Sequence, residues 1–259
     1  MGYKTDMFKP WKTRPMPGDK PRLTGIGDLM TRERFDGHDF WLASGHRTDS
    51  NPEEEPTWMR WPLNAEYESV ALTPLFPDRP VVVETETPIC LTPGSETRIY
   101  ARCPLWVRLD LIGKTQLAIE ELPTVVLSNT WFGAFTDGVL GYWVSSRTRT
   151  QIEPDPSRPW MAICPVHIRN RSDVELKIER ICLRVDHLSL FAKDGQLWAD
   201  ETQVAYRGLD KVSRIENTGK RPTEADGAKL ASAPRAPLDD SITARTFSSL
   251  KALSKSVAQ

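Results

Sequence analysis

The chain has 259 residues, of which 39% are hydrophobic and 27% charged, and its formal net charge is −1. The hydrophobic residues are numerous enough to form a core. Because the net charge is close to zero, no overall electrostatic field attracts nucleic acid or an anionic membrane surface, and neither is an expected partner. No apolar run approaches the roughly 18 residues of a spanning helix, and the N-terminus lacks the apolar block of a secretory signal, so we expect a cytoplasmic protein without a membrane span.

The four cysteines, Cys90, Cys103, Cys164 and Cys182, are widely spaced and form no C-x-x-C pair. Metal clusters normally use such close pairs to place two ligands on one turn. We therefore expect four small buried thiols, with no metal, no cofactor and no structural disulfide.

Twenty-one prolines and fifteen glycines divide the chain into short pieces, which favours strands and loops over long helices. Residues 1–22, rich in Pro, Lys and Asp, read as an extended segment. Residues 33–42 read as a hairpin, because Asp36-Gly37 supplies the positive φ of a tight turn.

Apolar and polar residues alternate with period two over much of residues 97–111, 139–149 and 164–179. This alternation places one set of side chains on each face of a strand. The phase slips near Glu179-Arg180, which predicts a β-bulge or a strand that crosses between sheets. Residues 188–198 read as another hairpin around Lys193-Asp194-Gly195.

Many short strands joined by Gly/Pro turns predict an all-β fold, an antiparallel β-sandwich over residues 23–216. Residues 217–240, rich in Gly, Ala, Pro and charge, are expected to be a disordered linker. Residues 241–257 show near-helical spacing and predict a short amphipathic helix: a tether for a partner, a self-docking latch, a surface anchor, or a frayed tail. Its apolar residues are Ile242, Phe247, Leu250, Leu253 and Val257.

The sequence shows no catalytic constellation. The histidines (His38, His46, His167 and His187) accompany no G-x-S-x-G elbow, no H-E-x-x-H and no phosphate-binding glycine loop. His167 falls on the polar face of its expected strand, where a solvated histidine is the simpler interpretation. Nothing singles out a carboxylate pair among 35 acidic residues, so a hydrolase built on acidic groups is kept only as a minor alternative.

The most unusual run is a loop that combines a flexible backbone with large aromatics, followed by a strand with further candidate contacts. Its residues are Asn129, Thr130, Trp131, Phe132 and Gly133, then Trp143, Arg147 and Arg149. Aromatic and arginine side chains are typical anchors of an interface or ligand site. The alternatives are that the aromatics plug one end of the sandwich and that the arginines pair with Glu175 or Glu179.

Several segments, in this order, resemble the domain-of-unknown-function family 432. They are residues 88–94 (PICLTPG), 104–108 (PLWVR), 122–124 (LPT), 129–133 (NTWFG), 165–172 (PVHIRNRS), 188–191 (LSLF) and 195–198 (GQLW). That family has no assigned activity or cofactor, and the resemblance implies only a role beside small-conductance mechanosensitive channels, because members are often encoded next to them. The N-terminal extension and the tail after Asn217 depart from its pattern.

Together these observations predict a non-catalytic cytoplasmic accessory protein that docks on a protein partner, for which a channel's soluble domain is one candidate. A homo-oligomer is also compatible with the sequence. The alternative is a carbohydrate- or anion-binding sandwich in which Trp106, Trp131 and Trp143 stack on the ligand and Arg147 and Arg149 grip it.

Overall fold

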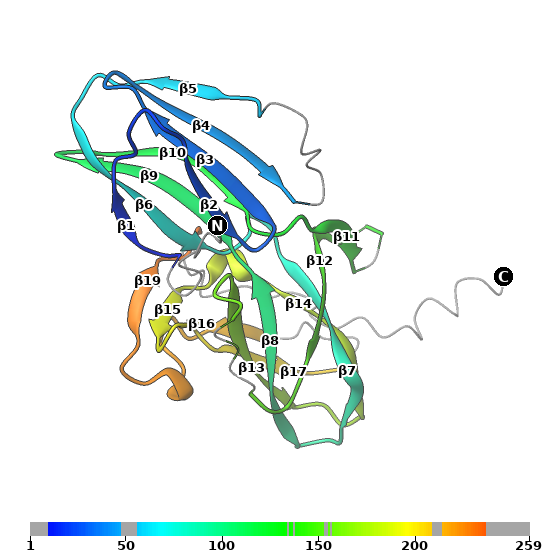
Figure 1. The fold of residues 1–259 in the computed structure, drawn as a ribbon. Coiled ribbons are helices and arrows are strands. Elements are labelled where there is room, and N and C mark those ends of the chain that lie inside the picture. Colours follow the sequence, from blue (N-terminus) through cyan, green and yellow to red (C-terminus); the bar gives the residue numbers. More distant parts are fainter. Residues whose placement is uncertain are drawn as a thin grey trace. The chain divides into compact units, whose positions relative to one another are not determined.

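The computed structural model describes residues 10–47, 56–133, 135–136, 138–152, 155, 157–208 and 214–236. Within these ranges the chain is nearly all β, and its helices are the single 3₁₀ turns η1 (Val185–His187) and η2 (Thr223–Ala225) (Figure 1). The predicted all-β class is therefore confirmed.

Contacts divide the chain into two compact units that are interleaved along the sequence. The first unit comprises Met1–Leu75, Pro104–Val126 and Asp155–Trp160, and the second comprises Phe76–Cys103, Leu127–Pro154 and Met161–Gln259. The single domain predicted over residues 23–216 thus spans parts of both units.

The first unit contains two four-stranded sheets in which every strand pair is antiparallel. One has the order β1 (Thr13–Pro15), β6 (Tyr67–Leu75), β9 (Trp106–Gly113) and β10 (Gln116–Pro123). The other has the order β2 (Arg22–Ile26), β3 (Leu29–Phe35), β4 (Asp39–His46) and β5 (Met59–Pro62).

The hairpin predicted at Asp36-Gly37 joins β3 to β4. Gly37 has a φ of 97°, a conformation that a side chain disfavours. The Asp36 carboxylate accepts the N–H groups of His38 and Asp39, and these bonds together with one from Trp41 lower the pKa of Asp36 to about 2. Local chemistry alone therefore specifies this turn.

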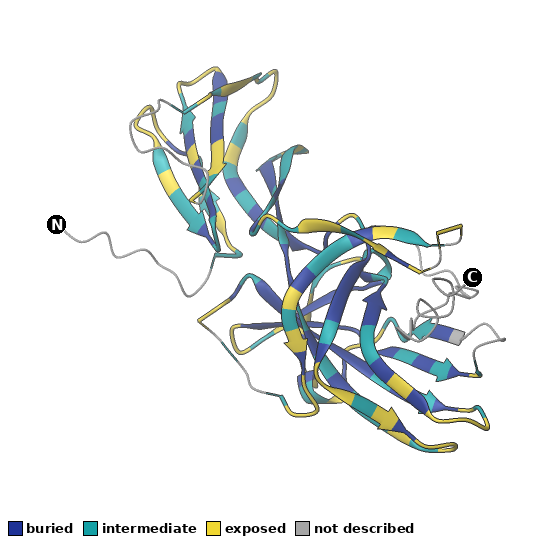
Figure 2. Ribbon diagram, turned by 90° about the vertical axis from the view of Figure 1, so that its right-hand side faces the viewer, coloured by how far each residue is buried: buried dark blue, intermediate teal, exposed yellow. Residues whose placement is uncertain are grey.

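Both sheets of the first unit contribute to one apolar core. Phe40 and Leu42 from β4 share it with Val107, Leu109 and Leu111 from β9, all buried. Along β9 the buried Val107 and Leu109 alternate with the half-buried Trp106 and Arg108, as the sequence predicted. Figure 2 shows buried and more exposed residues interspersed along the strands.

The described part of the N-terminal segment, residues 10–22, contributes to this unit rather than serving as a mere lead-in. β1 pairs with β6, and Arg14 lies 3.1 Å from the fully buried carboxylate of Glu33 on β3. Arg22 lies 2.7 Å from the other oxygen of the same carboxylate. A buried charge requires such partners, so residues before 23 satisfy a group inside the unit.

The second unit contains the other two sheets. One has the order β11 (Ser128–Phe132), β12 (Val139–Thr148), β7 (Val81–Leu91) and β14 (Leu176–Leu183). The other has the order β18 (Arg214–Asn217), β17 (Thr202–Tyr206), β13 (Met161–Asn170), β16 (Gln196–Ala199), β15 (Leu190–Lys193) and β19 (Lys229–Ser232), while β8 (Glu96–Pro104) also pairs with β13.

Three strand pairs in this unit are parallel, where the sequence predicted antiparallel sheets throughout: β12 with β7, and β13 with both β16 and β17. The sequence pattern could not predict the direction of these pairs, for a topological reason. Parallel partners need long connections, and alternation within a strand carries no information about the direction of its neighbour.

The slip predicted near Glu179-Arg180 is present as a break in register between Ile178 and Arg180, where β14 pairs with β7. Ile178 and Ile181 are both fully buried on either side of it, as the change of phase requires. The hairpin at Lys193-Asp194-Gly195 joins β15 to β16, with positive φ at Asp194 (50°) and Gly195 (79°).

The prediction of a disordered linker over residues 217–240 is wrong for residues 217–236, the part of it that the structure describes. η2 and β19 lie in it, and β19 pairs with β15. Ala225 and Ala228 pack with Phe191 and Trp198. A polar, Gly/Ala-rich composition signalled disorder, but small residues also fit closely against aromatics when a sheet edge is available. The helix predicted over residues 241–257 lies outside the described residues.

Candidate functional site

The run 129–133 predicted as a loop is mostly a strand. β11 pairs antiparallel with β12, which places Trp131 opposite Leu140 and Phe132 opposite Val139. β11 ends the order β11-β12-β7-β14, so its outer edge pairs with no other strand in the described ranges. Gly133 follows with a φ of 109°, which lets the chain turn out of the strand.

One face of this hairpin packs inward. Phe132 is buried with Val82 and Cys182, and Val139 and Trp143 pack against the same cluster. Arg180 lies over the Trp143 ring at 5.2 Å. The alternative of aromatics folded into the scaffold therefore describes Phe132 and Trp143.

The opposite face carries large apolar side chains outward. Trp131 is 53% exposed and Leu140 is 44% exposed, and the two face each other across the strand pair. Phe135, between the strands, is 95% exposed. We call Trp131, Phe135 and Leu140 the hairpin patch. Exposed apolar patches are a feature of protein interaction sites.

Polar groups brace the strands beside the patch. Arg79 donates to the Asn129 side-chain oxygen at 3.2 Å and lies 5.5 Å from the centre of the Tyr142 ring. The Tyr142 hydroxyl donates to Asp78 at 2.9 Å, and burial together with this bond raises the pKa of Tyr142. Thr130 lies opposite Gly141, where any side chain would collide with the Pro80 carbonyl at 2.6 Å.

Of the arginines predicted for the same site, Arg147 lies farther along β12 and Arg149 just beyond its end. Arg147 and Arg149 are exposed, and Arg149 pairs with Glu86 at 3.2 Å rather than with the predicted Glu175 or Glu179. Glu179 instead pairs with Lys177. Trp131 pairs with Leu140 near the start of β12, whereas Arg147 and Arg149 follow seven and nine residues later, so the length of the extended chain keeps them apart.

The cysteines are free thiols that differ in their burial. Cys103, Cys164 and Cys182 are buried free thiols whose pKa values burial raises, whereas Cys90, predicted to be buried, is exposed. His46 contacts the Pro123 carbonyl at 2.8 Å. In the described ranges no cluster of His, Cys, Asp or Glu is placed to hold a metal ion.

Sequence reasoning missed Phe135 and Leu140. A signal was available for Phe135, because a large apolar residue stands directly before the turn Thr136-Asp137-Gly138. Leu140 could not be assigned, since alternation gave two faces of β12 without showing which one is covered. Among the residues that the structure describes, no helix is long and apolar enough to cross a lipid bilayer.

Comparison with known proteins places the chain in a family. Neither a search of curated proteins nor a search of solved structures found a match. A family model described as a protein of unknown function (DUF432) matches residues 22–251, which is most of the chain and includes both the hairpin patch and the ordered tail that the resemblance had set aside. The chain therefore belongs to the DUF432 family.

Proposed function

We propose that this chain is a cytoplasmic accessory protein that binds a protein partner through the hairpin patch. The observation that carries the proposal is the concentration of exposed apolar area. Of eight exposed large hydrophobic residues in the described ranges, three lie on this one hairpin, and two are aromatic. Aromatic anchors at a sheet edge are typical of protein interfaces.

The occupant we propose is a different protein that presents an extended apolar segment. Among the described residues no other strand pairs with the outer edge of β11, and Trp131 and Leu140 offer side-chain contacts on one face. Adding a strand to such an edge uses both features at once. The soluble domain of a membrane channel is the candidate suggested by the family resemblance.

The scaffold proposed for this role is a β-sandwich. In the first unit, residues of both four-stranded sheets meet in one core, which supports that arrangement there. The four free cysteines fit a reducing compartment. The helix proposed at 241–257 would add a second contact, in cis or in trans.

The test is photo-crosslinking in cells. A photoreactive amino acid replaces Phe135, whose 95% exposure means that the exchange leaves the fold intact, and a second variant carries it at Leu230, which is 62% exposed on β19. We expect position 135 to yield a discrete adduct with another protein, and Trp131→Ser with Leu140→Thr to abolish that adduct without lowering Tm.

Two outcomes oppose the proposal. An adduct only with a second copy of this chain would assign the patch to self-association. Equal adducts from positions 135 and 230, or none from either, would remove the hairpin patch as a docking site.

A further inference from the structure

A second site lies on the other sheet of the second unit, apart from the hairpin patch. A pocket of about 420 Å³ opens on the face formed by β13, β17 and β18. Pockets of a few hundred Å³ accommodate small ligands. Its lining residues are His167, Arg169, Arg171, Gln203, Val204, Ala205, Arg207 and Glu216.

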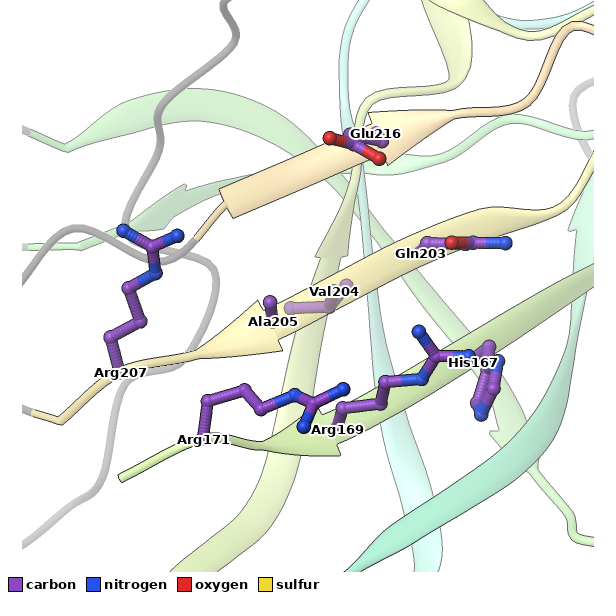
Figure 3. A pocket seen from close by; sticks show the side chains of 8 residues that line it. All are labelled: His167, Arg169, Arg171, Gln203, Val204, Ala205, Arg207 and Glu216. Carbon is purple, nitrogen blue, oxygen red and sulfur yellow. The ribbon is translucent and has the colours of Figure 1, made fainter. Parts of the chain in front are cut away.

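The parallel pairing of β13 with β17 builds this pocket. His167 pairs with Gln203 and Arg169 with Ala205, so side chains at alternate positions point to one face in two adjacent rows. Figure 3 shows His167, Arg169 and Arg171 in succession along β13, beside Gln203, Ala205 and Arg207. The small Ala205 side chain leaves the hollow between the longer ones.

Positive charge gathers at one end of the pocket. At the other end, Glu96 on β8 lies 2.9 Å from Arg169, whose charge it balances, and 3.4 Å from His167. Between the residues that the structure describes, no ion pair involves Arg171 or Arg207. These two follow the ends of parallel strands paired at Asn170 and Tyr206, so their backbones leave the sheet side by side.

The backbone beneath Arg171 is held firmly. The fully buried Asn170 side chain donates to the carbonyls of Leu91 and Val174, both at 2.8 Å, and accepts from the Ser172 N–H at 3.0 Å. The Arg171 N–H donates to the Tyr206 carbonyl at 2.7 Å. A fixed backbone lowers the entropy that binding must overcome.

From this arrangement we infer that the pocket binds a phosphate monoester or diphosphate, with Arg171 and Arg207 holding the terminal phosphate. Each guanidinium can donate two parallel N–H bonds to phosphate oxygens, and the two arginines that line this pocket supply the charge that a doubly charged group requires. Arg169, His167 and Gln203 then face the remainder of the ligand. The sequence suggested Arg147 and Arg149 as anion-binding residues. The inferred site uses the residues of this pocket instead.

Calorimetric titration of the full chain with inorganic pyrophosphate tests the inference, with sulfate as the comparison anion. We expect saturable binding that Arg171→Ala/Arg207→Ala weakens by about tenfold or more, because two charge-assisted sites are lost. Lys177→Ala/Arg180→Ala removes the same charge from β14 and should leave binding unchanged. Arg171→Lys/Arg207→Lys should bind with intermediate affinity, because it keeps the charge but loses the forks.

A flotation assay with phosphatidylcholine vesicles, with and without phosphatidic acid, distinguishes a soluble phosphate ligand from a lipid headgroup. Binding to pyrophosphate alone indicates a soluble organic phosphate, and binding only to vesicles with phosphatidic acid indicates a lipid headgroup. The inference is overturned if neither probe binds, if sulfate binds equally well, or if the Arg171→Ala/Arg207→Ala protein binds like the wild type. None of these results bears on crosslinking at position 135, so the two proposals fail independently.

Discussion

At the scale of single residues, buried carboxylates show how the fold constrains ionisation. Asp200 is fully buried, and its oxygens accept the N–H of Ser189 at 2.7 Å and of Gly219 at 2.9 Å. Burial nevertheless dominates and raises the pKa of Asp200 to about 6. The buried Glu33 carboxylate, by contrast, forms ion pairs with two arginines. The hydrogen bonds from Ser189 and Gly219 to the Asp200 carboxylate come from backbone N–H groups, so ionising it still destabilises the folded state.

This raised pKa predicts a pH-dependent stability. The folded state binds the Asp200 proton more tightly than the unfolded chain, so the stabilisation is complete below about pH 4 and is lost as the pH rises to about 6. Asp200→Asn cannot ionise. We therefore expect its unfolding free energy to rise relative to the wild type by about 2 kcal/mol between pH 4 and pH 7, measured by urea denaturation.

Asp36→Asn is the matched control. The Asp36 pKa of about 2 lies below this window, so its difference from the wild type should stay nearly constant from pH 4 to pH 7. Parallel curves for all three proteins would contradict the assignment of the pH dependence to Asp200.

At the scale of elements, short-range chemistry decides the turns, while contacts decide the strands between them. Asp36-Gly37 and Asp194-Gly195 are turns in the structure because glycine adopts positive φ without strain. The Asn and Gly of the 129–133 run favour a loop, yet pairing with β12 makes all of it except Gly133 a strand. Pairing partners override local preference whenever a sheet edge is available.

The hairpin between β15 and β16 gives a direct test of turn chemistry. At Gly195 a Cβ would meet nothing within 4 Å, so Gly195→Ala introduces only the strain of a positive φ. We expect this variant to lose about 1–2 kcal/mol of unfolding free energy in urea. Gly45→Ala, on β4 with open space and no positive φ, should be neutral or slightly stabilising. Equal losses in both variants would mean that something other than backbone strain acts at position 195.

At the scale of the whole molecule, the chain passes repeatedly between the two units. β7 and β8 lie in sequence between β6 and β9, which pair with each other in the first unit. β7 itself pairs with β12 and β14, far ahead in the chain. No cut in the sequence therefore separates the units cleanly.

Truncation tests this interleaving. Residues 1–126 contain every strand of the first unit but carry β7 and β8 without their partners. Because unpaired, largely apolar strands promote association, we expect this fragment to aggregate or bind a hydrophobic dye, whereas the full chain does neither. A monodisperse fragment with dispersed amide resonances would contradict the expectation.

The sequence by itself determined the β class, the glycine turns and the phase slip in β14, because these depend on local backbone preference and on the two-residue period of a strand. Only the tertiary structure decided the parallel pairs, the ordering of the tail through β19, and the presence of both Arg171 and Arg207 in the lining of one pocket. Each of these joins residues distant in the chain. Alternation shows that a strand has two faces, but the identity of its neighbour depends on how the whole chain packs.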